Sequence, residues 1–384
     1  MFNRGLIMKI CILTVEYSPI ESGVAVACRR IVNSLKKKNE VHVLTFSTDE
    51  DGYLVNHKRI IESNEEEGVY VHRISPYSGT LTNVPAQEIQ NMCYFLEKLD
   101  KKFDFEIFHG FNLTGVGYVT VFMAKMLKKK SIVSIRGNDI GRDIFDLNKL
   151  FGIKWVIENV NQLTFVAPDL LEYANNLMKC KKKSTVILNS LDPFDFYFKD
   201  IKLKFDGFVV CFSGVVRRKK GFSYLFEAFS RFIEKYKGTL LIVGELMKEE
   251  KLSYLKMIEE LKLEGHVMIT GRMPHNIVLN YVNLSDVFVM PALSEGCSNS
   301  LLEAMYCKKP CIATNVGAAP KLIKDGKNGL LIEPHSVDEI YKALMKLKQS
   351  KKLCDLMGEE AKKTILTKFT PKNELKEWMR VYKK

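Results

Sequence analysis

Two carboxylates flank a run of small polar residues near position 300. The sequence SEGCSNSLLEAM spans 294–305 and contains Glu295 and Glu303. Ser and Asn are good N-cap residues, so a helix is predicted to begin at about 298–300. The unpaired amides of a helix start bind anions, and ionised carboxylates accept hydrogen bonds from hydroxyl groups. This pattern fits a ligand that carries both a phosphate and several hydroxyls.

Composition limits the class of protein. The chain has 384 residues, of which 46% are hydrophobic and 27% are charged, as expected for a water-soluble protein of two or three domains. The most apolar early run, 10–15, is too short to span a bilayer. The nine cysteines form no C-x-x-C pair and no cluster with metal-ligand spacing. This usage indicates reduced thiols in a cytoplasmic protein.

Positive charge is in excess. The formal net charge is +13, and lysine and arginine recur in short runs. Such runs are either solvated helix ends and loops or a source of attraction to an anionic surface, such as a membrane leaflet or a polyanion. Nucleic acid is a less suitable partner, because the runs lack interleaved aromatic residues and no nucleic-acid motif is present.

Short apolar runs alternate with helical patterns along most of the chain. The runs predicted as strands are KICILTV, EVHVLTF, EIFHGF, KSIVSI, LTFVA, STVIL, FVVCFSG, GTLLIVG, HVMITG, DVFVMP, KPCIAT and GLLIEP. Most of the segments between them have apolar residues at three- and four-residue spacing, which predicts amphipathic helices. Alternation of this kind predicts an α/β fold, with parallel sheets covered by helices on both faces.

The alternating pattern breaks at 189–207, which is rich in Pro, Asp and aromatic residues and has no periodicity. One sheet of about a dozen strands would be unusually large, so we predict two doubly wound domains. The predicted limits are 1–192 for the N-terminal domain, 193–367 for the C-terminal domain and 368–384 for a final helix that packs back on the N-terminal domain. A cleft lined by the carboxyl ends of both sheets is expected between such domains.

Several segments together resemble a known family of enzymes. Glu295 and Glu303, in the context PALSEGCSNSLLEAM, resemble the E-x7-E motif of family 4 retaining glycosyltransferases. Further segments that resemble this family are SPIESGVAVACRRIVNSL, VILNSLD, FSGVVRRKKG, LLIVGE, HVMITGR and KPCIATNVGAAPKLIKDGKNGLLIEP. The resemblance covers nearly the whole chain and is dense from 186 to 334.

This resemblance implies a GT-B fold, in which two Rossmann-like domains face each other and the C-terminal one binds a nucleotide sugar. It also implies that no metal and no cofactor is required, because lysine, arginine and backbone amides neutralise the diphosphate. The family's mechanism is front-face displacement, in which the departing phosphate oxygen helps to remove the acceptor proton.

The resemblance also assigns roles to individual residues. Glu303 would accept hydrogen bonds from the ribose hydroxyls, Glu295 would contact the donor sugar, and Lys220 would neutralise the leaving diphosphate. The remaining candidates are Gly214, Cys297, Ser298, Asn299 and Ser300 around the sugar and diphosphate, Gly271 and Arg272 beside the base, and Gly23 in the N-terminal loop. Structural alternatives exist: Glu303 would be stabilised in a first helical turn by the helix dipole, and Glu295 would be an exposed loop acid. The basic run RRKK would be a solvated turn, and Gly271 would serve only as a turn residue.

The chain departs from the family pattern in three places. Val215 occupies the position of a frequent arginine, and we expect Arg217 to reach the same phosphate. Arg136 stands where many members have a histidine. Arg136 is a candidate to bind the sugar or phosphate. Its alternative role is structural, as an ion pair with Asp139 or Asp143. Ser22 replaces the first of two glycines.

His109 resembles the first histidine of the family's H-x-H stretch. This likeness makes His109 a candidate for a catalytic role in the acceptor or phosphate loop. A histidine at the end of a strand is also often structural, so the catalytic role and the structural role both remain open.

The resulting hypothesis is a cytoplasmic retaining glycosyltransferase, peripheral at the inner face of the cell membrane. It would transfer a hexose or N-acetylhexosamine, from a UDP-sugar, to a glycan or lipid-linked acceptor in surface polysaccharide or glycolipid assembly. Two alternatives remain: a UDP-sugar 2-epimerase that needs no acceptor, and a non-catalytic sugar-nucleotide-binding subunit of a glycosylation complex.

Overall fold

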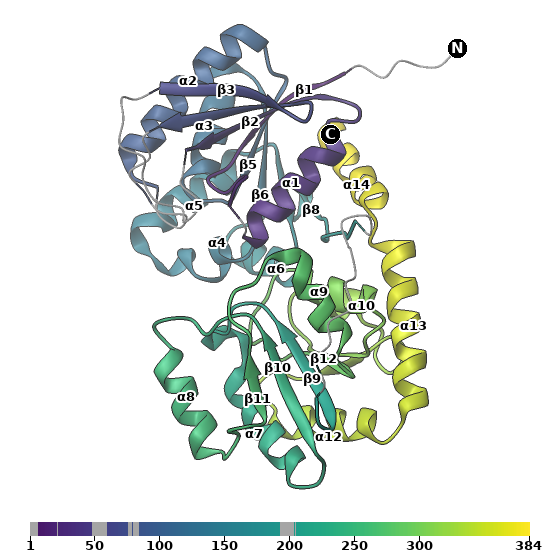
Figure 1. Cartoon of the computed structure of the whole chain (residues 1–384). Coiled ribbons are helices and arrows are strands. Elements are labelled where there is room, and N and C mark those ends of the chain that lie inside the picture. The colour runs from purple at the N-terminus through teal and green to yellow at the C-terminus, as the bar shows by residue number, and fades with distance from the viewer. Residues whose placement is uncertain are drawn as a thin grey trace, which may run out of the picture. The chain divides into compact units, whose positions relative to one another are not determined.

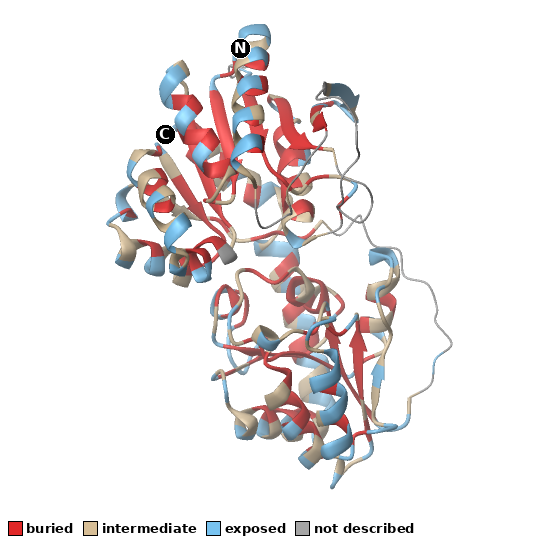
Figure 2. Ribbon diagram, turned by 90° about the vertical axis from the view of Figure 1, so that its left-hand side faces the viewer, coloured by how far each residue is buried: buried red, intermediate tan, exposed pale blue. Residues whose placement is uncertain are grey.

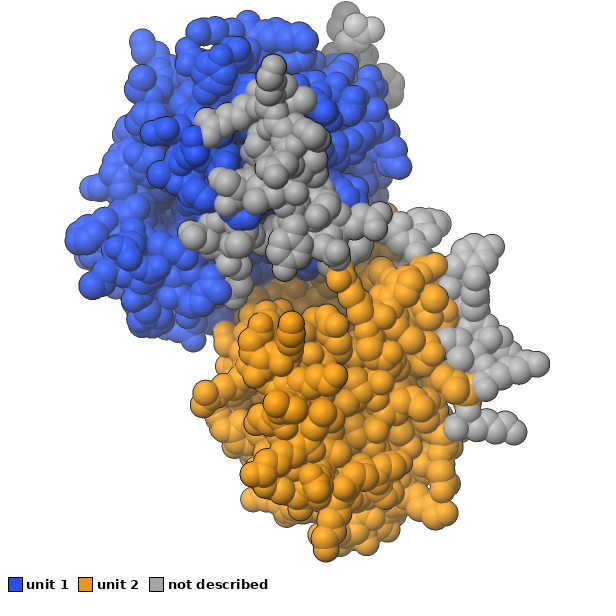
Figure 3. Space-filling view, turned by 60° about the vertical axis from the view of Figure 1, so that its left-hand side comes forward, with its two compact units in different colours: residues 1–188, 371–384 blue, residues 189–370 orange. Residues whose placement is uncertain are grey.

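The computed structural model divides the chain into two compact units (Figure 3). Unit 1 comprises 1–188 and 371–384, and unit 2 comprises 189–370. The residues that the structure describes are 7–20, 22–47, 60–75, 79, 84–192, 203 and 205–384. We expected the chain to change domain at 192 and 367, and the compact units change at 188 and 370. Part of the predicted boundary segment 189–207 lies outside the described residues.

Unit 1 contains an eight-stranded sheet in the order β3-β4-β2-β1-β5-β6-β7-β8 (Figure 1). Its strands are β1 (Lys9–Leu13), β2 (Glu40–Phe46), β3 (Ile60–Glu66), β4 (Val69–Ser75), β5 (Ile107–Phe111), β6 (Lys130–Ile135), β7 (Gln162–Phe165) and β8 (Ser184–Val186). All neighbouring strands are parallel except β3 and β4, which form an antiparallel pair at one edge. The six parallel strands other than β4 were predicted from the sequence, whereas β3 and β4 were not.

Helices cover both faces of this sheet. They are α1 (Gly23–Leu35), α2 (Ala86–Phe103), α3 (Val116–Leu127), α4 (Asn138–Gly141), η1 (Asp143–Phe145), α5 (Leu147–Asn159), α6 (Pro168–Leu177), η2 (Lys181–Lys183) and α14 (Pro371–Lys383). Figure 2 shows the central strands buried and the outer helices buried on one side only. Strands that are covered on both faces need a nearly continuous apolar sequence, which is why KICIL is apolar after its first residue.

Unit 2 contains a six-stranded parallel sheet in the order β11-β10-β9-β12-β13-β14. The strands are β9 (Phe208–Ser213), β10 (Gly238–Val243), β11 (Val267–Ile269), β12 (Val287–Met290), β13 (Cys311–Thr314) and β14 (Leu330–Ile332). The helices are η4 (Arg218–Lys220), α7 (Phe222–Ile233), α8 (Lys251–Glu260), α9 (His275–Asn283), α10 (Asn299–Tyr306), α11 (Ala319–Leu322), α12 (Val337–Lys348) and α13 (Lys351–Lys368). All six strands were predicted.

The strand order of unit 2 reverses between β9 and β12. From β9 the chain proceeds outward through β10 to β11, and then returns to the other side of β9 and proceeds through β12 to β14. In open parallel sheets, ligands bind at such a switch point, outside the carboxyl ends of the strands. The loops after β9 and β12 are therefore where this fold favours a binding site.

The last helix, α14, belongs to unit 1 and packs against α1. Trp378 and Tyr382 of α14 are almost completely buried in the core of unit 1. Arg30 of α1 donates to both carboxylate oxygens of Glu374, with Nε–Oε2 and Nη2–Oε1 distances of 2.8 and 3.2 Å. This pair fixes the position of the helix, because two N–H groups of the arginine guanidinium match the two oxygens of the carboxylate.

Among the described residues, no helix is both long and apolar enough to cross a membrane.

Buried histidines make unit 1 sensitive to acid. Burial, followed by the charge of His42, lowers the pKa of His72 to about 4, and burial, followed by Arg136, lowers the pKa of His109 to about 3. The His72 ring is held by a hydrogen bond to His42, with 2.9 Å between Nδ1 of His42 and Nε2 of His72. A neutral ring is therefore part of the folded state.

We expect the melting temperature to fall when the pH is lowered from about 7 to about 5. An unfolded histidine takes up a proton near pH ~6.5, whereas His72 and His109 stay neutral in the folded chain. The free energy of unfolding is therefore highest above that pH. It decreases as the pH falls, by on the order of 1–2 kcal/mol per histidine at pH ~5. Thermal unfolding at both pH values measures the effect. His109→Gln should flatten the dependence, and an unchanged slope in that variant would contradict the assignment.

Candidate functional site

The loops after β9 and β12 approach each other closely in unit 2. Gly221, which follows η4, has a φ of +69°, and a Cβ at this position would lie 2.0 Å from the carbonyl oxygen of Pro291. A glycine is therefore required for both the backbone conformation and the space. The amide of Leu293 donates to the carbonyl oxygen of Lys219 over 2.8 Å. The contact between these loops fixes the two segments that carry Lys220 and Glu295.

Lys220 and Glu295 form an ion pair across these two loops. Their side chains are only 13% and 17% exposed. Burial acts to raise the pKa of Glu295, but the charge and hydrogen bond of Lys220 together with the charges of Lys219 and Arg217 outweigh it, and the pKa is lowered. The carboxylate is thus ionised at neutral pH in a site with several positive charges. The predicted Glu295 is not an exposed loop acid, so that structural alternative is wrong.

A third loop supports the backbone of Glu295 from the end of β13. Gly317 has a φ of +61°, and a Cβ there would lie 2.4 Å from the carbonyl oxygens of both Glu295 and Gly296. The amide of Ala318 donates to the carbonyl oxygen of Gly296 over 2.8 Å. Gly317 was not among the predicted site residues, because its contact is made across the sheet edge and has no local signal in the sequence.

The start of α10 confirms the predicted N-terminus. Ser298 is the N-cap, and its hydroxyl accepts from the amide of Leu301 over 3.3 Å. The Oγ atoms of Ser298 and Ser300 are 3.0 Å apart. Asn189 donates through Nδ2 to the carbonyl oxygen of Cys297 and to Oδ1 of Asn299, each over 2.9 Å. The predicted segment from Cys297 to Ser300 is therefore a capped helix start at the carboxyl end of the sheet.

Glu303 is one turn into α10 and is buried, with 5% of its surface exposed. Burial raises its pKa, and His275, whose Nε2 lies 3.6 Å from Oε1, acts in the opposite direction. A buried carboxylate is costly unless it is hydrogen-bonded or paired, so this position favours a ligand that donates hydrogen bonds. His275 was not predicted; its only local signal is its place at the start of α9, directly after Pro274.

The glycine loop after β9 is also closely packed. Gly214 has a φ of +129°, and a Cβ on Gly244 would lie 2.1 Å from its carbonyl oxygen. Arg217 contributes to the low pKa of Glu295, and its Nε atom is buried without a hydrogen-bond partner in the described part of the chain. Since a buried donor without a partner is costly, this guanidinium is suited to an anionic ligand. That Arg217 replaces the arginine expected at Val215 stays a prediction.

Gly271 and Arg272 follow the edge strand β11. Gly271 has a φ of +74° and open space where a Cβ would lie, and Arg272 is exposed. The hydroxyl of Thr270 accepts from the amide of Gly244 over 3.1 Å and donates to the carbonyl oxygen of Gly271 over 3.0 Å. These bonds connect the loops after β10 and β11, but no contact with Glu295 or Lys220 is observed for the Gly271–Arg272 pair.

Three predicted residues lie in unit 1, at or near the carboxyl end of its sheet. Gly23 is the first residue of α1, whose N-cap is Ser22. Arg136 follows β6, and its guanidinium carbon lies 5.9 Å from the ring centroid of Phe111. Asp139 accepts from the amides of Arg136 and Gly137 over 3.4 and 2.9 Å. This aspartate therefore fixes the backbone of the turn that carries Arg136.

His109 has a structural environment. It lies within β5 with no exposed surface, with Nδ1 2.5 Å from the hydroxyl of Tyr382 and Nε2 2.7 Å from Oγ of Ser134. Because both ring nitrogens are occupied and the ring is covered, a substrate has no access to it. The predicted role in an acceptor or phosphate loop has no support in this environment.

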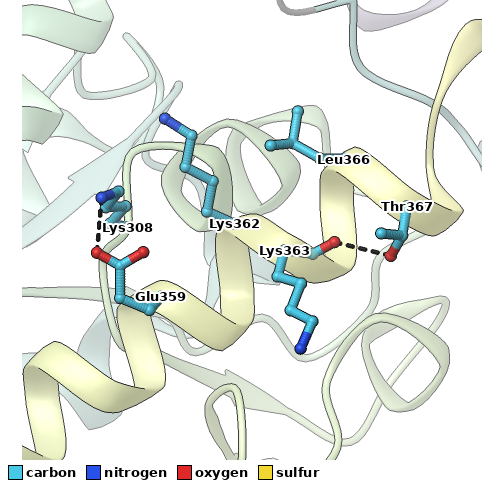
Figure 4. Close-up of a pocket in the computed structure, with 6 residues that line it drawn as sticks. All are labelled: Lys308, Glu359, Lys362, Lys363, Leu366 and Thr367. Atoms are coloured by element: carbon cyan, nitrogen blue, oxygen red, sulfur yellow. Dashed lines mark hydrogen bonds and ion pairs between the residues drawn. The ribbon is translucent and has the colours of Figure 1, made fainter.

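A separate hollow lies on unit 2 between α13 and the turn after α10 (Figure 4). Its volume is about 400 Å³, and it is lined by Lys308, Glu359, Lys362, Lys363, Leu366 and Thr367. Lys308 and Glu359 form an ion pair at its edge, over 2.6 Å. None of the predicted site residues lines this hollow. Among the described residues, no group of three or more His, Cys, Asp or Glu side chains is placed to hold a metal ion.

Comparison with known proteins identifies a family for the C-terminal part of the chain. Residues 193–364, which include both glutamates and the glycine loop, match the family described as glycosyl transferases group 1. The C-terminal part of this chain, 193–364, is a glycosyl transferases group 1 region. It is 24% identical to the N-acetyl-alpha-D-glucosaminyl L-malate synthase of Bacillus anthracis over 277 residues, which cover 69% of this chain and 71% of that protein.

Two further relatives extend the likeness. The UDP-Gal:alpha-D-GlcNAc-diphosphoundecaprenol alpha-1,3-galactosyltransferase of Escherichia coli is 31% identical over 185 residues, 47% of this chain and 46% of that protein. HepE of Anabaena, solved in complex with UDP, superposes with a TM-score of 0.76 at 14% identity and covers 98% of this glycosyltransferase and 100% of that chain. The GT-B fold expected from the sequence is confirmed.

Removal of one partner of the ion pair should destabilise unit 2. We expect Lys220→Met to lower the free energy of unfolding by about 2 kcal/mol, because it leaves the carboxylate of Glu295 buried without its main counter-charge. The double variant Lys220→Met with Glu295→Gln should recover most of this loss. Urea denaturation of the unaltered protein, the two single variants and the double variant measures the interaction energy between the two side chains. Additive losses in the double variant would contradict a direct interaction between the two side chains.

Proposed function

We propose that this glycosyltransferase retains the configuration of the transferred sugar and uses a UDP-linked hexose or N-acetylhexosamine as its donor. The observation that carries the proposal is the convergence of Lys220, Glu295 and the capped start of α10 at the switch point of unit 2. This convergence combines positive charge, helix amides and carboxylate acceptors, which a sugar diphosphate requires together.

Each group then has a distinct task with the donor. Glu303 accepts from the ribose hydroxyls, which satisfies its buried carboxylate. Lys220 and the unpartnered Nε of Arg217 bind the diphosphate, and Glu295 accepts from the hydroxyls of the sugar. HepE of Anabaena, the structural relative solved with UDP, supports uridine as the base.

The reaction is written as a displacement on one face of the sugar. The bond between the anomeric carbon and the diphosphate oxygen breaks, a bond from the acceptor oxygen to that carbon forms, and the acceptor proton passes to the departing diphosphate oxygen. Lys220 and the α10 amides stabilise the negative charge that develops on the leaving group. No side-chain nucleophile and no metal ion is needed in this scheme.

The acceptor is a glycan or lipid-linked hydroxyl compound, used in surface polysaccharide or glycolipid assembly. Support comes from the Escherichia coli relative, whose name specifies a diphosphoundecaprenol-linked acceptor. The net charge of +13 is compatible with an anionic acceptor or with the surface that carries it. The proposed location is cytoplasmic, peripheral at the inner face of the cell membrane.

Donor binding should depend on Glu303 and not on metal. We expect UDP to bind with equal affinity in EDTA and in Mg²⁺, and Glu303→Gln to weaken binding about tenfold or more, because charged acceptors make the stronger hydrogen bonds. Calorimetric titration with UDP measures both. Glu264→Gln is the matched control, since Glu264 is an exposed glutamate of the same unit. Equal affinity in the two variants would contradict the assigned site.

Turnover should require an acceptor. With UDP-sugar and a polyprenyl-diphosphate sugar or a soluble glycan acceptor in EDTA, we expect a new glycoside with the donor's anomeric configuration, identified by NMR. Lys220→Met should reduce kcat at least about a hundredfold, by the usual cost of one group that stabilises developing charge. Epimerised UDP-sugar without acceptor would instead favour the 2-epimerase, and tight UDP binding without turnover on any acceptor would favour the non-catalytic subunit.

A further inference from the structure

Helix α5 of unit 1 exposes large apolar side chains. Phe145 is 80% exposed, Leu147 is 72% exposed and Phe151 is 77% exposed. Leu147 and Phe151 are four residues apart and share one face of the helix, and Phe145 lies in η1 directly before it. Side chains of this size are seldom left so exposed in a row, so the stretch from η1 through the first turns of α5 needs an explanation.

The exposed face of α5 is not the face that holds the helix in place. Ile153, Val156 and Ile157 of α5 are buried, so the helix already has its apolar contact with unit 1. The surface contrasts with unit 2, where Leu252 of α8 is 82% exposed beside charged neighbours. Leu255 of the same helix is 41% exposed, so α8 exposes two leucines, whereas the stretch from η1 into α5 exposes three large side chains at 72% or more.

Helix α3 extends the apolar surface. It packs beside α5 (Figure 1), and its exposed side chains Tyr118, Phe122 and Met126 recur every fourth residue. The rings of Tyr118 and Phe122 are stacked, with centroids 5.8 Å apart, and Tyr118 also contacts Trp155 of α5, with centroids 5.0 Å apart. These six side chains, Phe145, Leu147, Phe151, Tyr118, Phe122 and Met126, are here called the apolar face.

Basic residues accompany the apolar face on the same elements. They are Lys125, Lys128, Arg142, Lys149 and Lys154. Arg142 and Lys149 share the buried carboxylate of Asp143, at 2.9 and 3.5 Å. The acidic groups on the exposed side are Asp146, which is 3.9 Å from Lys149, and Glu158. Positive charge is therefore in excess on these elements and their caps.

We infer that the apolar face is a docking surface for an anionic lipid bilayer. Phenylalanine, leucine and methionine would enter the acyl boundary, Tyr118 and Trp155 would lie at the level of the headgroups, and the lysines would attract anionic lipids. The excess of lysine and arginine on these elements favours a bilayer over a second copy of this chain, because two copies would bring like charges together. The purpose of this surface rests on the proposed lipid-linked acceptor, but the binding itself requires no turnover.

Vesicle flotation of the full chain tests the inference. The probes are phosphatidylcholine vesicles with and without about 30% phosphatidylglycerol, at low and high salt. We expect binding only to the anionic vesicles, and weaker binding at high salt. The double variant Leu147→Ser with Phe151→Ser should bind at least about tenfold less, since each side chain loses its apolar burial. Leu252→Ser is the matched control and should bind like the unaltered protein.

Several outcomes would overturn the inference. They are absence of binding to anionic vesicles, equal binding of the double variant, or a stable dimer that the double variant dissociates. UDP titration of the same samples separates this failure from failure of the proposed function: a double variant that binds UDP normally but not vesicles supports docking alone. Normal vesicle binding without UDP binding would leave the docking surface and remove the donor site.

Discussion

The ion pair between Lys220 and Glu295 is the interaction on which the candidate site depends. It joins the loops after β9 and β12, the two strands between which the order of the sheet reverses. Bringing these loops together is sterically demanding, and Gly221 and Gly317 are the positions at which any side chain would collide with a backbone carbonyl. The energetic cost of burying two charges is acceptable only because each neutralises the other.

This arrangement explains how several positive side chains can be held in place before a ligand arrives. Positive side chains gathered in one place repel one another and are costly to bury without an anion. Glu295 supplies that anion within the chain, and its lowered pKa shows that Lys220, Lys219 and Arg217 act on it together. Under the proposed function, a diphosphate would take over the positive charges and sugar hydroxyls would donate to the carboxylate. Because folding has already fixed these groups, little reorganisation is needed on binding, which is the condition for effective charge stabilisation.

The sequence predicted the parallel strands best, because buried strands are continuous apolar runs that are legible locally. It missed β3, whose sequence IIESNEE is polar, and β4, whose exposed Tyr70 and buried His72 interrupt the apolar pattern. The site was predicted where its residues form a contiguous motif, as at the start of α10. His275, Gly317 and Asn189 were not assigned to the site, because each acts through a contact with a segment distant in the chain. The covered ring of His109 reflects the same limit: its partner, Tyr382, comes from the last helix.

The two ends of unit 2 also hold the start of α10 in place. The chain enters unit 2 at 189 and leaves it at 370, and these ends are joined by the amide of Leu191, which donates to the carbonyl oxygen of Phe369 over 2.9 Å. Asn189, the first residue of the unit, holds the backbone of Cys297 and the side chain of Asn299. The helix start that would bind the donor is therefore held from the same short segment that closes unit 2. A substitution in this segment would therefore disturb the start of α10 through these direct hydrogen bonds, and the contacts in the core of the sheet would be unaffected.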